Sequence, residues 1–382
     1  MSNLWDLSHI RPNNDVVVPG DTIPAMFWNA VEKRGPKVWL RQKHLGIWRS
    51  QTWDQTAEAV SEIAGGLMSL GFQHGETASI LSNTVIEWVL SDLAVLSCGG
   101  VANGIYPTDA ASQVEYLSAD SRTTVLFVED DEQLDKYLEA AERLPQVKRV
   151  IVFDMEGLQS FDDPRVISLQ RLREIGCEYL KTQPQILAQR TAARDPAEVA
   201  VLVYTSGTTG RPKGAMISQN NIVAVLSALS AALFEGVPRG GERIAFLPLC
   251  HIAERLIGAF IPLERGSVVN YVENPETVFE NLREVRPHLF FAVPRVWEKV
   301  YSQVAIALGE ADKLQRAAYA LALRIGAEVA QCTLENRQPS ASLALRYRLA
   351  RWLVLDNVKR MIGLDRVEVG LTGAAPISPD LI

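Results

Sequence analysis

Short runs of β-branched and other apolar residues alternate with longer helical patterns along most of this chain. The candidate strands lie at 77–81, 101–106, 124–128, 149–153, 199–205, 243–247, 267–272, 288–293 and 367–371. The candidate helices lie at 54–70, 85–96, 131–143, 219–234 and 277–285. Repeated β-α alternation is typical of parallel sheets covered by helices. Nine strands favour two sheets over one, so we expect an α/β fold of two parallel-rich sheets flanked by helices in a layered sandwich.

The length of 382 residues predicts two or three domains or subdomains. The best boundary is the polar stretch 183–197, just before the most apolar candidate strand. We expect a first α/β subdomain over 1–190 and a second over 191–382. The second would include a helical insert at about 301–362, with one clear break at 336–342.

The candidate helix at 85–96 has an amphipathic pattern. The residues that fall close to one of its faces are Val85, Trp88, Val89, Asp92 and Leu96. We therefore expect that face to be buried and the opposite face to be exposed to solvent.

Composition excludes several classes of protein. The formal net charge is −7 and the pI is about 5.4, which argues against nucleic acid as the main partner. The cysteines form no C-x-x-C pair, which disfavours zinc and disulfide frameworks and favours a reducing compartment; they are Cys98, Cys177, Cys250 and Cys332. The first residues do not read as a signal peptide. No stretch has eighteen uninterrupted apolar residues, and the nearest is 222–234. We expect a cytoplasmic protein.

Residues 200–214, AVLVYTSGTTGRPKG, join an apolar strand directly to a loop rich in glycine and hydroxyl groups. Such a loop can turn its backbone N–H groups toward one anion, and Lys213 adds a positive charge. The sequence differs from the Walker pattern, because Gly210 is not followed by Lys and Gly214 occupies the Ser/Thr place. A flexible linker is the alternative. It is disfavoured because linkers are not usually joined to a strand and closed by Pro-Lys-Gly.

The segment DPAEVAVLVYTSGTTGRPKGAMISQNNI resembles the signature of the adenylate-forming (AMP-binding) superfamily, which includes acyl-CoA synthetases, luciferases and peptide-synthetase adenylation domains. Three further segments resemble the long-chain fatty acyl-CoA synthetase subgroup, and they are FLPLCHIAERLIG (246–258), FFAVPRVWEKVY (290–301) and GLTGAAPISPDL (370–381). Order and spacing agree along the whole chain. The resemblance implies the N-terminal domain of an acyl-CoA synthetase.

The resemblance also implies roles for the residues of the loop. Thr205 would help to hold Mg²⁺, and the β- and γ-phosphates of ATP would be wrapped by Ser206, Gly207, Thr208, Thr209, Gly210 and Lys213. The substrate carboxylate would attack the α-phosphorus, giving an acyl-adenylate and pyrophosphate. Coenzyme A would then accept the acyl group. A metal and oriented donors suit the charge that develops on the leaving pyrophosphate.

Further site residues are implied by the other matching segments. His251 would lie beside the acyl-adenylate, and with Lys213 it is the candidate catalytic residue. Its alternative is an ordinary helix start with a local His–Glu or Glu–Arg pair. Trp297 would be a gate over the acyl tunnel, with a core tryptophan as the alternative. The adenine would lie against Gly373, Ala374, Ala375 and Pro376, although Gly-Gly-Ala is commoner there than the Gly-Ala-Ala of this sequence.

The substrate class follows from the stretch 249–251. Amino-acid-activating relatives place an Asp there, whereas this chain has Leu-Cys-His. We therefore expect a long-chain fatty acid:CoA ligase. Two enzyme alternatives stay open, an aryl- or short-chain acid:CoA ligase and a fatty acyl-AMP ligase that serves a carrier protein. The alternative outside enzymes is a catalytically silent nucleotide-binding scaffold. The oligomeric state is open between a monomer and a homodimer.

Basic residues outnumber acidic ones between 313 and 351, with Leu and Trp side chains among them. A basic amphipathic helix can lie on an anionic membrane, which here would be the inner membrane surface. The alternative is a solvated helix face, and it is favoured because charge runs are usually solvated.

The last residues have the pattern of a helix start, with Ser378 as N-cap and Pro379 at the first helical position. The family's Tyr-Gly-x-Thr-Glu motif, ribose-binding Asp and C-terminal domain with its catalytic Lys are not in these 382 residues. We therefore expect this chain to be the N-terminal part of a longer enzyme. Alone, it should make no measurable acyl-CoA and bind ATP weakly at best.

Overall fold

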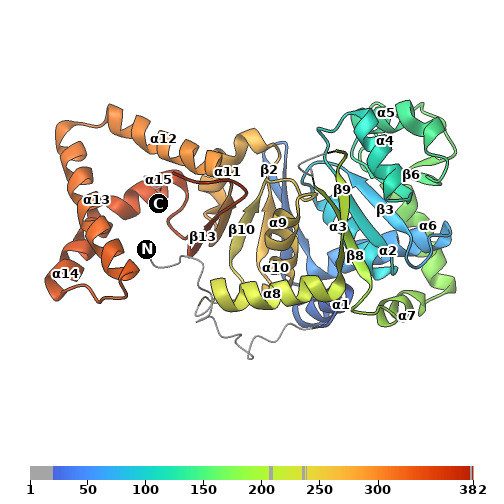
Figure 1. Cartoon of the computed structure of the whole chain (residues 1–382), viewed down its shortest axis with the longest axis horizontal. Coiled ribbons are helices and arrows are strands. Elements are labelled where there is room, and N and C mark those ends of the chain that lie inside the picture. The colour runs from blue at the N-terminus through green and yellow to red at the C-terminus, as the bar shows by residue number, and fades with distance from the viewer. Residues whose placement is uncertain (1–19, 206–209, 235–236, 238, 379–380, 382) are drawn as a thin grey trace. The chain divides into compact units, whose positions relative to one another are not determined.

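The computed structural model describes residues 20–205, 210–234, 237, 239–378 and 381 (Figure 1). The chain divides into two compact units. Unit 1 comprises Met1–Gly240 and Ala245–Glu273, and unit 2 comprises Gly241–Ile244 and Asn274–Ile382. The subdomain boundary predicted at residues 190 and 191 falls inside unit 1.

A seven-stranded sheet forms the centre of unit 1 (Figure 1). Its strands, in spatial order, are β7 (Val166–Ser168), β6 (Arg149–Val152), β5 (Thr123–Val128), β3 (Thr77–Leu81), β4 (Val101–Ile105), β8 (Val199–Thr205) and β9 (Lys213–Ser218). Neighbouring strands are parallel except β8 and β9, which form an antiparallel pair. Every residue of β3 and β4 is buried, as expected for parallel strands covered on both faces.

The helices that accompany this sheet are α2 (Trp53–Ser69), α3 (Ile86–Ser97), α4 (Ala111–Asp120), α5 (Asp131–Ala140), α6 (Leu169–Thr182) and α7 (Ile186–Ala192). Two of them, α2 and α6, pack closely because glycines meet at their interface. A Cβ on Gly176 would lie 1.8 Å from the carbonyl oxygen of Glu62. No side chain larger than a hydrogen atom fits at this position.

The second sheet is formed by the other six described strands. In unit 1, β1 (Val38–His44) pairs antiparallel with β2 (Ile47–Thr52) and parallel with β11 (Val268–Tyr271). In unit 2, β12 (Leu289–Ala292) pairs parallel with both β10 (Glu242–Ala245) and β13 (Val369–Thr372). The predicted α/β fold with two mostly parallel sheets flanked by helices is therefore confirmed.

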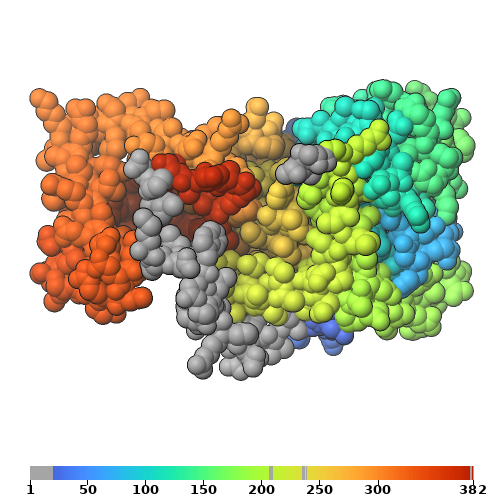
Figure 2. Space-filling view, viewed as in Figure 1, coloured from blue at the N-terminus to red at the C-terminus, as the bar shows by residue number. Residues whose placement is uncertain are grey.

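Unit 1 also contains α1 (Ile23–Arg34), α8 (Gln219–Leu233), α9 (Ile252–Glu254), the π-helix η3 (Arg255–Phe260) and α10 (Ile261–Arg265). Figure 2 shows α8 at the surface of this unit. Its buried residues include Ile222, Leu226 and Ser230, one helical turn apart, so a single face packs inward. Among the residues that the structure describes, α8 and every other helix are too short or too polar to cross a membrane.

Unit 2 is mainly helical beyond β12. Its helices are α11 (Val278–Val285), α12 (Pro294–Glu310), α13 (Lys313–Leu334), α14 (Ala341–Ala350), the π-helix η5 (Arg351–Leu355) and α15 (Asp356–Ile362). The predicted break at 336–342 is confirmed, but a second break at Ala311 and Asp312 was not expected. Asp312 forms a capping box with Gln315 and so begins a new helix.

Two other expectations were wrong. Helix α3 is not amphipathic, because Ile86 and all of 88–97 are buried, including Asp92. The loop after β8 was expected to continue through Gly214, whereas Lys213 is already the first residue of β9. The sequence of β9, KGAMIS, lacks a clear apolar alternation, which explains why it did not read as a strand.

Candidate active site

The β8–β9 hairpin carries the candidate phosphate-binding loop. Thr205 ends β8, Lys213 begins β9, and the two are paired in the antiparallel ladder. Both residues are exposed. Lys213 makes no ion pair with the part of the chain that the structure describes. The predicted loop residues Ser206, Gly207, Thr208 and Thr209 lie outside the described residues.

Gly210 is described, and its backbone has φ +98° with open space around the position of a Cβ. This left-handed conformation favours glycine on backbone grounds alone. The glycine therefore allows the chain to turn back toward Pro212 and Lys213. The sequence predicted a loop that turns its backbone N–H groups toward an anion, and a glycine in this conformation is compatible with that turn.

A cavity of about 380 Å³ lies beside the hairpin within unit 1. It is lined by Tyr106, Asp109, Gln113, Leu117, Val203, Tyr204, Thr205, Pro212, Cys250, His251 and Ile252. Tyr106 follows β4 and Thr205 ends β8, so the cavity lies at the carboxyl ends of neighbouring parallel strands. Ligands of open α/β sheets bind at such ends. The structure thus brings together two predicted site residues, Thr205 and His251, from distant parts of the sequence.

His251 lies at the start of α9 and is exposed. Its Nδ1 accepts a hydrogen bond of 3.2 Å from the backbone N–H of Ala253. Because Nδ1 accepts, the proton of the neutral ring resides on Nε2. The predicted alternative of a helix start is therefore true of His251, which both caps α9 and lines the cavity. The two roles are compatible, since capping leaves an Nε2–H donor.

The π-helix η3, which continues directly from α9, is anchored by a buried ion pair. Arg255 donates from Nε and Nη2 to the two carboxylate oxygens of Asp92 on α3, and the Nε bond measures 3.1 Å. The guanidinium carbon also lies 5.0 Å from the ring centre of Trp88. Both charged side chains are almost fully buried, with exposed fractions of 1% and 2%. This pair holds the helical segment that begins at His251 against α3.

Sequence reasoning missed Tyr106, Asp109 and Cys250, which line the cavity between Thr205 and His251. Burial, followed by the nearby Cys250 and Asp109, raises the pKa of Tyr106 to about 12. Burial, followed by the charge of Asp109, raises the pKa of the Cys250 thiol to about 12. Both groups are therefore neutral at pH 7. The available signal was the position of Tyr106 at the end of the strand predicted at 101–106, with Asp109 three residues further on.

Cys250 packs against β4 at close range. A Cβ on Gly104 would lie 2.7 Å from the Cα of Cys250, so only glycine permits this approach. Its buried side chain forms part of the wall of the cavity, where the raised pKa disfavours the thiolate. All four cysteines are free thiols in the structure.

The other predicted site residues lie in unit 2. Trp297, on α12, donates from Nε1 to the carbonyl oxygen of Leu371 at 3.3 Å and meets the Phe290 ring edge-on at 5.0 Å. Its half-buried ring thus packs on β12 and β13, as the core-tryptophan alternative describes. The gate role stays a prediction.

The predicted adenine-binding segment follows β13. Ala374, Ala375 and Pro376 are exposed, and a Cβ on Gly373 would meet only the Phe291 ring at 3.8 Å. Ala374 has φ +69°, a left-handed conformation that costs a non-glycine residue about 1–2 kcal/mol. This strain gives a physical reason why glycine is the commoner residue at this position. The adenine contacts themselves stay a prediction.

The residues present fit ATP with Mg²⁺ in one respect. Among the described residues, no group of three or more His, Cys, Asp or Glu side chains could hold a metal. Mg²⁺ commonly binds through substrate phosphates and water with few protein ligands. The exposed hydroxyl of Thr205 is compatible with such binding.

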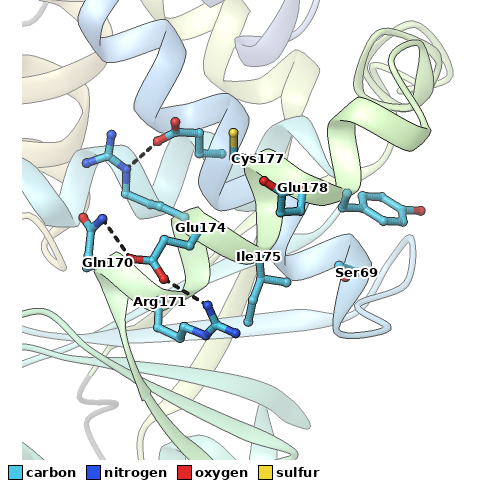
Figure 3. Close-up of a pocket in the computed structure, with 10 residues that line it drawn as sticks. Ser69, Gln170, Arg171, Glu174, Ile175, Cys177 and Glu178 are labelled. Carbon is cyan, nitrogen blue, oxygen red and sulfur yellow. Dashed lines mark hydrogen bonds and ion pairs between the residues drawn. The ribbon is translucent and has the colours of Figure 1, made fainter.

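Two larger cavities of unit 1 lie elsewhere. One, of about 620 Å³, is lined mainly by α6, and Figure 3 shows its side chains. They pair with one another: Gln170 and Arg171 donate to Glu174, and Arg173 donates to Glu62 on α2. The other, of about 560 Å³, is lined by acidic and basic residues between β1, β2 and α3. Neither contains a residue of the predicted site.

The model of the AMP-binding enzyme family matches residues 27–382. The chain therefore belongs to this family of adenylate-forming enzymes, to which acyl-CoA ligases also belong. It is 31% identical over 369 residues to the long-chain-fatty-acid–CoA ligase ACSBG2 of Rattus norvegicus, with 94% of this chain and 54% of the relative covered. It is also 31% identical to the long-chain-fatty-acid–CoA ligase heimdall of Drosophila melanogaster, covering 95% and 54%. The chain spans about half the length of these relatives.

Solved structures agree on the fold. The adenylation domain of a carboxylate reductase from Mycobacterium chelonae superposes with a TM-score of 0.65 at 21% identity, covering 96% of this chain and 56% of that one. The adenylation domain of a carboxylic acid reductase from Segniliparus rugosus, in complex with AMP, gives 0.61 at 20% identity and covers 98% and 61%. At these identities the likeness shows the fold alone.

Proposed function

We propose that the protein containing this chain is a long-chain fatty acid:CoA ligase that forms AMP. The proposal is carried by the cavity in which Thr205 and Pro212, at the two ends of the phosphate-binding loop, lie with His251. A nucleotide bound by the loop and an acid held near His251 would share this space. The named relatives, which are long-chain-fatty-acid–CoA ligases, support the choice of substrate.

The chain's own residues would act by binding and orientation. The ammonium of Lys213 and the hydroxyl of Thr205 would hold the polyphosphate of ATP. Mg²⁺, when bound, would neutralise charge on the phosphate oxygens. The Nε2–H of His251 would donate a hydrogen bond to an oxygen of the reacting acid or its adenylate, where negative charge develops. No acidic side chain occupies 249–251, which suits an acid without an ammonium group.

The reaction proposed has two steps. A carboxylate oxygen of the fatty acid attacks the α-phosphorus of ATP, and the bond to pyrophosphate breaks. The thiol of coenzyme A, after losing its proton, then attacks the acyl carbonyl and releases AMP. Because the chain spans about half the length of its relatives, the second step is proposed for the whole protein and not for these 382 residues.

The test is acid-dependent exchange of pyrophosphate into ATP by the whole protein, with acids of short, long and aromatic type. Exchange that requires a long-chain acid, and thioester formation with coenzyme A, is expected. Exchange only with short or aromatic acids, or transfer only to a carrier protein, would favour the alternatives. His251→Ala should reduce exchange about 10²–10³-fold, the usual effect of removing a donor to developing charge. A fully active variant would remove His251 from the mechanism.

We also propose a cytoplasmic location in which the basic helices of unit 2 form a solvated face. Two of their arginines support this interpretation, since Arg346 pairs with Glu328 and Arg351 pairs with Asp356. Such pairs reduce the charge available to anionic lipid. Co-sedimentation with anionic vesicles at low salt is the measurement, and binding there would favour a peripheral membrane contact through the exposed Leu345 and Trp352.

A further inference from the structure

Helix α4 (Ala111–Asp120) holds both ends of the phosphate-binding loop. Before the loop, the hydroxyl of Tyr204 donates to Asp120 Oδ2 at 2.7 Å. After the loop, the hydroxyl of Tyr116 donates to the carbonyl oxygen of Pro212 at 2.7 Å. Tyr116 and Asp120 are four residues apart on one helix and therefore lie on the same face. A single helix face thus fixes the chain where it enters and where it leaves the loop.

Two ring contacts reinforce these hydrogen bonds. The guanidinium carbon of Arg211 lies 5.0 Å from the ring centre of Tyr116. The ring of Tyr204 packs over Gly214, where an added Cβ would lie 3.0 Å from the phenol carbon. Burial, followed by the hydrogen bond to Asp120, raises the pKa of Tyr204 well above its usual range, so its hydroxyl remains a donor. The contacts join α4 to β8 and to Arg211 and Pro212, the two residues that precede β9.

The helix itself is firmly packed. Val114 and Leu117 are buried in the hydrophobic cluster on this side of the seven-stranded sheet, and Tyr116 and Tyr204 pack against the same cluster. Gln113 and Leu117 also line the cavity beside Thr205 and His251. On its other side the hairpin pairs with no further described strand, since β9 is an edge strand of its sheet. Without α4, the hairpin end would depend on its own ladder.

We propose that Tyr116 and Asp120 are positioning residues that fix Thr205 and Lys213 for binding of a nucleotide polyphosphate. This inference rests on the proposed nucleotide site. The physical reason is preorganisation: a loop whose ends are fixed before binding loses less conformational freedom when the ligand arrives. Neither residue is assigned a contact with the nucleotide, so their effect passes through the position of the hairpin.

The test compares four variants of the whole protein that contains this chain by calorimetric titration with MgATP. Tyr116→Phe keeps the ring and removes only the hydroxyl, and Asp120→Ala removes the acceptor. Each should weaken MgATP binding about 3- to 10-fold, the effect of one hydrogen bond. Asp120→Asn retains an acceptor and should bind within about 2-fold of the unmodified protein. Tyr179→Phe, on α6, is the matched control and should leave the affinity unchanged.

Two further measurements separate positioning from a loss of fold and from failure of the site itself. The melting temperature of each variant should stay within a few degrees of the unmodified protein, while backbone amides at 211–214 exchange faster in Tyr116→Phe and Asp120→Ala. Unchanged MgATP affinity in both variants, together with a loss in Lys213→Ala, would overturn the role of α4 and leave the nucleotide site standing. No saturable MgATP binding by the unmodified whole protein would overturn both.

Discussion

Thr205 and Lys213 are paired across the antiparallel ladder of β8 and β9, at the point where the hairpin opens into its loop. The pairing places a hydroxyl and an ammonium at the same end of one hairpin. Their separation is therefore set by the ladder. This relationship explains how a short sequence motif can offer, at a fixed distance, the two groups that we propose to bind phosphate.

Removal of the ammonium should weaken nucleotide binding without weakening the fold. Lys213→Met keeps the aliphatic part of an exposed side chain, so the free energy of unfolding should change by less than about 0.5 kcal/mol. A charge-assisted bond to phosphate is worth about 1.5–3 kcal/mol, so MgATP affinity should fall about 10- to 100-fold. Titration calorimetry is the measurement, and Lys181→Met on α6 is the control. Equal affinities of the two variants would argue against a phosphate contact by Lys213.

Substitution of Gly210 should be costly although the space around it is open. Because Gly210 has φ +98°, Gly210→Ala is expected to lower the free energy of unfolding by about 1–2 kcal/mol. If the loop shifts to avoid this strain, nucleotide binding should weaken by the equivalent of about 5- to 30-fold. Gly309→Ala is the matched control, because Gly309 lies in α12 with equally open space. That variant should stabilise the chain by about 0.5–1 kcal/mol. Denaturant unfolding is the measurement: the free energy of unfolding should fall in Gly210→Ala and rise in Gly309→Ala.

Breaking the buried ion pair between Asp92 and Arg255 should strongly destabilise unit 1. Asp92→Ala leaves the Arg255 charge buried and is expected to cost about 3–5 kcal/mol. The double variant Asp92→Leu with Arg255→Met removes both charges and should recover much of that loss. Glu178→Ala, which breaks an exposed pair with Lys181, should cost no more than about 1 kcal/mol. Similar costs for the buried and exposed variants in urea unfolding would contradict this account.

Stability should fall as the pH drops below about 6.5 because of His288. Burial, followed by the charge of Arg366, lowers the pKa of His288 below its usual value of 6.5. As the pH falls, the unfolded chain therefore binds a proton at His288 before the folded chain does. The contribution of neutral His288 to the free energy of unfolding is complete above pH 6.5 and is lost as the pH falls through the folded-state pKa.

The variant His288→Asn tests this dependence, because its amide oxygen can still accept from the N–H of Glu242 as Nδ1 does. Unfolding in denaturant at pH 7.5 and at pH 5.5 should show a smaller difference in this variant than in the unmodified chain. His44→Asn, on β1, is the control and should retain the full difference. An unaltered pH dependence in His288→Asn would show that another group is responsible.

Much of the fold could be read from local patterns. All nine predicted strands exist, and β8 ends at Thr205 as expected, since a buried parallel strand is a run of apolar residues whatever it packs against. The strands that were missed, β1, β2, β7 and β9, are only partly buried or very short. Their sequences therefore have a weak apolar pattern, and only pairing with a neighbour makes them strands.

The amino-acid sequence by itself determined the sheet-forming runs, the composition of the loop and the family, because these depend on neighbouring residues. The tertiary structure alone decided which distant residues meet. Tyr116 reaches Pro212 across 96 residues, and Arg255 reaches Asp92 across 163. No local pattern encodes such contacts. The first arises because β4 and β8 are neighbours in the sheet, and the second because η3 packs on α3.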